Sequence, residues 1–224
     1  MPAHFTPELF TFLRALKRNN KREWFTARRD RYVSAVEAPM LQFIADVAPR
    51  LRTVSRAYVV DPRRTGGSMF RIHRDTRFSP DKSPFKTWAA ARFAHEARKR
   101  TDEGVPAFYL HLGPGECYGG GGVYHLEMPA LTRIRQHIVA APKQWEAVRR
   151  ADLVIEGDTL SRPPAGFDAT HRFIEDLKRK DLYAITEFAE KDVTSPEFLD
   201  RYIEACERAA PLVQFLTRGL GLRW

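Results

Sequence analysis

The spacing of apolar residues changes along this chain, and this change constrains the fold more than any other feature of the sequence. Before about residue 58, apolar residues recur at the three- and four-residue spacing of helices. From about residue 58 the period becomes two, which is typical of half-buried strands. Helical spacing returns from Pro129 onwards. The pattern predicts an α+β fold, in which helices at both ends of the chain pack on a central antiparallel sheet.

Two helices are expected at the N-terminal end. The first has Thr6 as its N-cap and Pro7 at its first helical position. Asn20 is expected to cap a second helix, whose apolar side continues to Leu51. Pro39 lies inside this second pattern and should kink or split the helix, because proline lacks a backbone N–H and clashes with the preceding turn.

Four short strands are expected in the middle of the chain. Phe70 and Ile72 alternate with more polar residues over residues 69–73, which predicts a half-buried strand with a charged outer face. Further strands are expected over residues 88–93, 107–112 and 123–126. The last two flank a loop that contains the glycine run at 119–122, and together they predict an antiparallel hairpin.

Three more helices are expected towards the C-terminus. One begins at Pro129 and continues to Trp145, and a short one surrounds residues 174–177. Ser195-Pro196-Glu197 opens the last helix. Because the sequence has neither an internal repeat nor a low-complexity linker, we expect residues 1–224 to form a single domain.

The composition indicates a soluble protein with one strongly basic region. No apolar run approaches the ~20 residues that cross a bilayer, so no membrane association is expected. The N-terminus lacks the pattern of a secretory peptide, which places the protein in the cytoplasm, and the oligomeric state stays open. The net charge is +9, and residues 61–100 hold eleven Lys or Arg residues against four acidic ones. Such a patch favours anionic partners.

Five of these eleven cations lie in residues 66–86, which we call the basic segment. Its candidate ligand-binding residues are Arg71, His73, Arg74, Arg77, Lys82 and Lys86. Guanidinium groups bind oxyanions through two hydrogen bonds and Lys adds a point charge, so the leading hypothesis is a pocket for a small anionic, phosphate-bearing ligand. The alternative is a structural lattice, in which Asp75 and Asp81 pair with the arginines and hold the loop on the sheet.

An enzyme is a second possibility. Asp75, Asp81 or Glu127 would act as acid or base, and the arginines would stabilise developing negative charge, as in phosphoester chemistry. The sequence leaves open whether any reaction occurs.

A nucleic-acid-binding or protein-interaction module is a third possibility. Phe70, Phe78, Phe85 and Trp88 are interleaved with cations, as stacking surfaces for bases would be. The same aromatic residues are also those expected in a core.

The hairpin supplies the candidate metal ligands. If its strands pair symmetrically about residue 118, His111 lies opposite His125 and Tyr109 opposite Glu127, all on one face. Two imidazoles and a carboxylate are a plausible set for a transition metal. Strand histidines are more often ordinary polar residues, so we expect no bound metal and assign no cofactor.

Several unusual motifs occur in a fixed order along the chain. They are Asn19-Asn20-Lys21-Arg22-Glu23-Trp24-Phe25, the basic segment, Gly122-Val123-Tyr124 with Glu127, Gly157-Asp158, Arg162 to Phe167, and Leu177 to Asp181. With these motifs the chain resembles the DUF2461 family of uncharacterised bacterial and fungal proteins from about Phe5 to Leu216. The resemblance implies no particular activity. Phe85 stands where the family tends to have Tyr and Leu126 where Pro often precedes the glutamate, so no phenolic hydroxyl is available at position 85.

Overall fold

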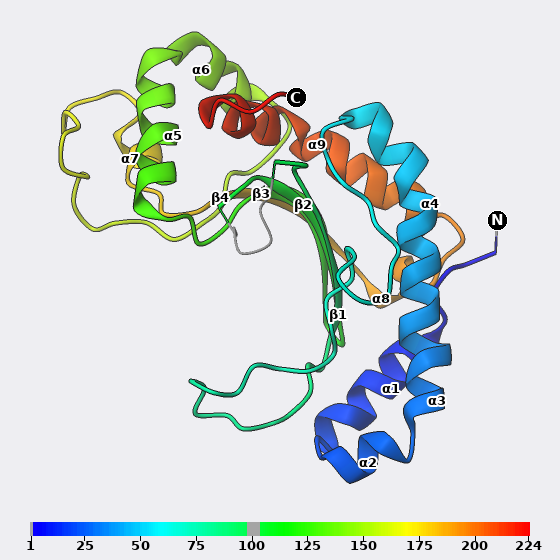
Figure 1. Ribbon diagram of the computed structural model, residues 1–224. Helices are drawn as coiled ribbons and strands as arrows, with labels where there is room; N and C mark the ends of the chain where they lie inside the picture. The colour runs from blue at the N-terminus through cyan, green and yellow to red at the C-terminus, as the bar shows by residue number, and fades with distance from the viewer. Residues whose placement is uncertain (1, 98–103) are drawn as a thin grey trace.

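A curved four-stranded antiparallel sheet forms the centre of the fold (Figure 1). The computed structural model describes residues 2–97 and 104–224. Each strand pairs with the next one along the chain, in the order β1-β2-β3-β4. The strands are β1 (Ala89–Ala94), β2 (Ala107–Gly113), β3 (Glu116–Val123) and β4 (Leu182–Phe188). The predicted α+β class with a central antiparallel sheet is confirmed.

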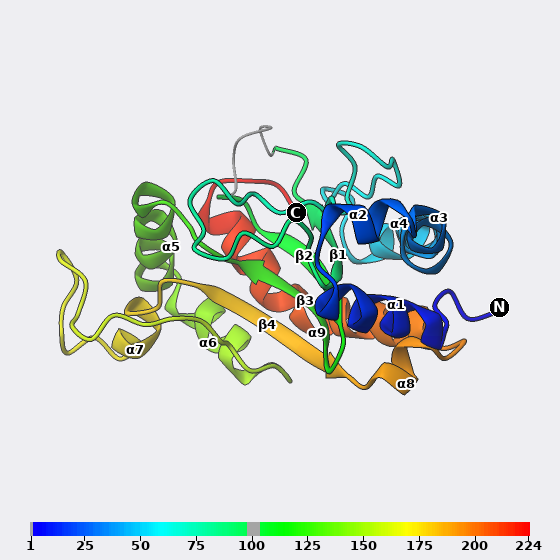
Figure 2. The ribbon, with the colours of Figure 1, turned by 90° about the horizontal axis from the view of Figure 1, so that it is seen from below.

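Helices from the two ends of the chain cover the convex side of the sheet (Figure 1 and Figure 2). These are α1 (Pro7–Arg18), α4 (Ala38–Val54) and α9 (Phe198–Gly219). Thr6 precedes α1 and Pro7 occupies its first turn, as the sequence predicts. The helix opened by Ser195-Pro196-Glu197 is α9, which packs against β3, β4 and α4.

The predicted second helix is divided into four pieces rather than two. They are α2 (Arg22–Thr26), α3 (Arg29–Tyr32), the π-helical turn η1 (Val33–Glu37) and α4. Pro39 cannot donate a backbone hydrogen bond, and the N–H of Ala38 donates to the carbonyl of Val33, five residues earlier. The wider π-helical turn therefore accommodates Pro39. Asn20 is not the cap, because Lys21 precedes α2.

The hairpin turns earlier than the sequence predicts. Its tight turn includes Gly115, whose φ of +78° suits glycine, and Gly113 pairs with Glu116. The glycine run at 119–122 is therefore not a loop but the middle of β3.

Close packing explains why β3 contains glycine. A Cβ atom on Gly119 would lie 2.7 Å from the ring of Tyr202, and one on Gly121 would lie 2.7 Å from Val213. Both partners belong to α9. The missing side chains allow α9 to lie directly on β3.

The described residues contain four further helices. They are α5 (Met128–Ala140), α6 (Pro142–Arg150), α7 (Ile174–Leu177) and α8 (Glu190–Val193). The helix predicted from Pro129 to Trp145 is divided at Pro142, because a residue before proline is disfavoured in the α region, and Ala141 has φ −121° and ψ 55°. The short helix α7 is confirmed, whereas α8 and β4 were not predicted.

One hydrophobic core joins the helices to the sheet. Its largest fully buried side chains include Phe10 of α1, Phe43 of α4, Phe108 of β2 and Tyr202 of α9. None of the described helices is both long and apolar enough to span a membrane. The core thus holds the elements that position the basic segment.

The two cysteines, Cys117 and Cys206, are free and buried. Burial raises the pKa of the Cys117 thiol to about 11 and that of Cys206 to about 12. Neither thiol is therefore activated as a nucleophile.

Candidate functional site

The basic segment leaves the edge of the sheet and folds back on itself. Met69 forms a bridge with Ala91 of β1, and His73 then forms a bridge with Phe85 in the returning half of the segment. The prediction of a strand over residues 69–73 is therefore wrong, because the backbone makes only isolated bridges there. The predicted alternation persists at one position, because Ile72 is buried while its neighbours are exposed.

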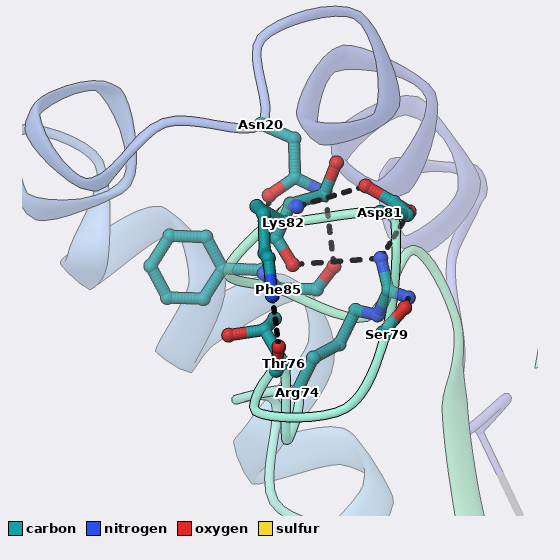
Figure 3. A network of polar contacts seen from close by, with 8 residues as sticks. Asn20, Arg74, Thr76, Ser79, Asp81, Lys82 and Phe85 are labelled. Atoms are coloured by element: carbon teal, nitrogen blue, oxygen red, sulfur yellow. Dashed lines mark hydrogen bonds and ion pairs between the residues drawn. The ribbon is translucent and has the colours of Figure 1, made fainter.

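The linker between α1 and α2 holds the returning half of the segment in place (Figure 3). The side chain of Asn20 accepts a hydrogen bond from the N–H of Phe85 at 3.1 Å and donates one to its carbonyl at 2.9 Å. The ring of Phe85 stacks on Phe25 with centroids 4.2 Å apart. The buried Phe85 thus anchors a segment that is otherwise mostly polar.

Arg74 is the most enclosed arginine of the segment. Its guanidinium pairs with Asp81 and also donates to the hydroxyl of Ser79 at 3.4 Å and the carbonyl of Ser83 at 3.5 Å (Figure 3). Only 26% of its side chain is exposed. These contacts are those of the predicted structural lattice.

Arg77 is also paired, but on the surface. It forms two hydrogen bonds with Asp75, at 3.0 and 2.7 Å, and 77% of its side chain is exposed. The Nζ of Lys82 donates to the carbonyl of Thr76 at 2.9 Å, which closes the tip of the segment. Neither cation is directed at an enclosed site.

The two carboxylates of the segment have lowered pKa values. The hydrogen bonds from Arg77 lower the pKa of Asp75 to about 2. Hydrogen bonds from Ser83, followed by the one from Arg74, lower the pKa of Asp81 to about 2. Both groups are ionised at neutral pH and are poorly matched to general acid or base chemistry there.

Lys86 differs from the other cations. Its Nζ donates to the carbonyl of Arg71 at 2.9 Å and lies 5.2 and 5.0 Å from the ring centroids of Phe70 and Trp88. Burial, and to a smaller extent the charge of Arg71, lowers the pKa of this half-buried ammonium. No carboxylate among the described residues forms an ion pair with Lys86 or with the guanidinium of Arg71.

A cavity of about 550 Å³ lies between the end of α1 and the basic segment. Its lining residues are Lys17, Asn20, Arg74, Asp75, Asp81, Ser83, Phe85, Lys86, Thr87 and Trp88. Of the predicted ligand-binding residues, the structure thus brings Arg74 and Lys86 to the cavity. His73 instead packs on Phe85, with ring centroids 5.3 Å apart. Arg98, Lys99 and Arg100, which belong to the basic region of the sequence, lie outside the described residues.

The contribution of α1 was not predicted. Lys17 lies in its last turn, where basic residues are common, so nothing in the sequence distinguishes it. Asn20 was interpreted as a helix cap, although its place between a helix and the motif residue Phe25 could have suggested a tertiary contact.

The candidate metal ligands, His111, His125 and Glu127, do not assemble. Because the hairpin turns at Gly115, His111 pairs with Tyr118 rather than His125, and Tyr109 pairs with Gly120 rather than Glu127. His125 has φ +52° in the link after β3, and Glu127 is the N-cap residue of α5. Across residues 2–97 and 104–224, no group of three His, Cys, Asp or Glu side chains is placed to hold a metal ion.

A family model described as "Conserved hypothetical protein (DUF2461)" matches residues 8–215. The chain belongs to the DUF2461 family. No match was found among curated proteins.

In this DUF2461 protein the motifs of the sequence gather at two places. Asn20 and Phe25 meet Phe85, which joins the first motif to the basic segment. After the C-terminal end of β3, the N–H of His125 donates to Asp181 at 2.7 Å, and this contact joins the later motifs. The cavity belongs to the first of these places.

Proposed function

We propose that this DUF2461 protein is a cytoplasmic protein that binds a small anionic, phosphate-bearing ligand in the cavity beside the basic segment. The observation that carries the proposal is the environment of Lys86. Its ammonium is half-buried, lines the cavity and has a main-chain carbonyl as its hydrogen-bond partner. A buried cation without a carboxylate partner is unfavourable, and a bound anion would remove that penalty.

The neighbouring charge of Arg71 strengthens this argument. Lys86 and Arg71 repel each other, since the charge of Arg71 contributes to the lowered pKa of Lys86. An oxyanion beside the ammonium of Lys86 would accept a charge-assisted hydrogen bond from it and offset this repulsion. Lys17, on the wall formed by α1, would add a third positive charge.

The enzyme alternative has less support. Asp75 and Asp81 are ionised and are bonded to arginines, so each would have to break an ion pair before it accepted a proton. Glu127 lies beyond the end of β3, whereas the segment meets the sheet at β1 near Ala91. Binding without turnover requires none of these groups to change its partner.

The nucleic-acid alternative rests on aromatic side chains that have divergent environments. Phe85 is buried, whereas Phe78 is 92% exposed and lies beside the guanidinium of Arg77. Phe70 and Trp88 are half-buried and contact Lys86. These positions suit one small ligand better than a continuous strand.

Isothermal titration calorimetry with inorganic phosphate and pyrophosphate tests the proposal. Lys86→Gln removes the charge at the cavity, and we expect it to weaken binding by about ten-fold or more, which corresponds to about 1.4 kcal/mol. Lys82→Gln is the matched control, because it removes the same charge from the same segment but outside the cavity lining.

The control variant should retain affinity within about two-fold at moderate salt, since an exposed charge is largely screened. An absence of binding to both anions would refute the proposal. So would an equal loss of affinity in the two variants, because binding would then depend only on net charge.

A further inference from the structure

A row of aromatic rings crosses the concave face of the sheet. His111 of β2 and Tyr118 of β3 are paired in register, and their rings are stacked with centroids 4.8 Å apart and planes 2° apart. Trp88 continues the row, with its centroid 4.9 Å from that of His111. The row lies opposite α9, because Gly119 and Gly121, which alternate with Tyr118, face that helix.

The rings keep accessible surface. Trp88, Tyr109 and Tyr118 are each only partly buried, and Gly120, which pairs with Tyr109, adds no side chain to this face. Figure 1 shows α4 and α9 on the other, convex side of the curved sheet. A planar molecule could therefore reach ring surface beside the row.

This aromatic row continues into the proposed anion site. Trp88 lines the cavity, and the ammonium of Lys86 lies 5.0 Å from its ring. Phe70 connects the two parts, with its centroid 6.1 Å from that of Trp88 and 6.0 Å from that of Tyr109. The cation and the ring row thus share one residue, Trp88.

His111 is the polar group of the row. It is 94% buried, its Nδ1 lies 3.3 Å from the hydroxyl of Tyr109, and its Nε2 has no hydrogen-bond partner among the described residues. Burial lowers the pKa of His111, which favours a neutral ring. A neutral imidazole adds no further repulsion to Lys86 and suits stacking with Tyr118 and Trp88.

We propose that the ligand is a nucleotide, whose phosphate binds at the ammonium of Lys86 in the cavity and whose base stacks on Trp88 at the start of the aromatic row. The inference rests on the proposed function and adds the chemical class of the ligand. The cavity volume of about 550 Å³ suits a molecule of this size. Bases stack on aromatic side chains with little regard to their identity, so the geometry selects a nucleotide rather than one particular base.

Calorimetric titration with adenosine 5′-monophosphate, ribose 5-phosphate and inorganic phosphate separates the two parts of the site. We expect the nucleotide to bind about ten-fold tighter than ribose 5-phosphate, because only the nucleotide has a base to stack. Trp88→Leu should remove this preference, so that the variant binds the nucleotide and ribose 5-phosphate with equal affinity.

Two further variants keep the test decisive. Trp88→Phe retains an aromatic ring and should keep most of the preference, and it serves if Trp88→Leu does not fold. Tyr124→Leu is the control, since it removes an exposed aromatic ring that follows β3 at the other end of the sheet.

Equal affinity for the nucleotide and ribose 5-phosphate would overturn the inference and leave the anion site intact. If none of the three compounds binds, the proposed function and the inference both fail. Binding of a single-stranded oligonucleotide without binding of the mononucleotide would overturn the inference in favour of a nucleic-acid surface.

Discussion

Asn20 and Phe85 are joined by two hydrogen bonds between the side-chain amide of the first and the main chain of the second. The side-chain amide of Asn20 pairs with Phe85 as the main chain of a neighbouring strand would, because it donates one hydrogen bond to this residue and accepts another from it. This contact links the α1–α2 connection to the basic segment. Lys17 of α1 and Lys86 of the segment both line the cavity beside this contact.

Replacing Asn20 should therefore loosen the basic segment. Asn20→Ala leaves a part-buried N–H and carbonyl of Phe85 unpaired, and we expect a loss of about 1 to 3 kcal/mol in the free energy of unfolding. Urea denaturation measures this loss, and hydrogen exchange should be faster at the Phe85 amide. Asn19→Ala is the control, because the Asn19 amide makes an exposed bond to the carbonyl of Ala15. Equal losses in both variants would contradict the prediction.

Two arginines of the same segment should differ in their effect on stability. Arg74→Ala removes the pair with Asp81 together with bonds to Ser79 and Ser83, and should cost about 1 to 2 kcal/mol. Arg77→Ala removes a pair on the surface and should change stability little. Chemical denaturation of the two variants side by side tests the ranking. If Arg77→Ala were the more destabilising, the described pairing would be wrong.

The glycines of β3 should be intolerant of substitution. A Cβ on Gly120 would lie 2.1 Å from the main-chain carbonyl oxygen of Ala184 in β4, and the backbone cannot move away without breaking the pairing of the strands. We expect Gly120→Ala to cost about 3 kcal/mol or more. Gly66→Ala is the matched control, since Gly66 has a φ of +74° but open space around it, and should cost about 1 kcal/mol. Thermal melts of similar midpoint for the two variants would disprove this difference.

Acid should destabilise the protein through the segment carboxylates. The pKa values of Asp75 and Asp81 are about 2 in the folded state, compared with about 3.9 in an unfolded chain. Between these values the unfolded state binds more protons, so stability is present above about pH 4 and is lost as the pH falls towards 2. Urea denaturation from pH 5 to pH 3 should show a shallower decline for the Asp75→Asn, Asp81→Asn double variant than for the wild type. Identical pH profiles would contradict the prediction.

The elements that depend on local signals could be predicted from the sequence. Thr6 and Pro7 mark the start of α1, and the residues around Ser195 mark the approach to α9, because these starts are encoded within a few positions. β1 was predicted to within one residue. In each case the pattern and the structure agree because no distant contact competes with them.

The remaining elements depend on contacts that the sequence does not display. Glycine usually marks a turn. In β3 the glycines instead leave room for Tyr202 and Val213 of α9. The predicted register of the hairpin was therefore wrong. The same error displaced His125 and therefore the candidate metal ligands. β4 was missed because its outward positions are also apolar or aromatic, as at Ile185, which weakens the alternation.

The candidate site also combines features that could be predicted from the sequence with features that depend on distant contacts. The sequence located the basic segment, but it could not assign the partner of Arg74, because this depends on how the loop returns past Ser79 and Asp81. It also gave no sign that Lys17 faces the segment from α1. The half-buried position of Lys86, which carries the proposed function, follows from the packing of two aromatic rings around it.

The contact between β3 and α9 also has a consequence for the newly made chain on the ribosome. The bare backbone of Gly119 and Gly121 is covered by Tyr202 and Val213, which are synthesised long after the strand itself. Glycine has little intrinsic preference for a strand, so β3 gains its order from a helix that does not yet exist when the strand emerges. Until then the apolar side of the nascent sheet is open, and it is the surface that a chaperone would have to shield.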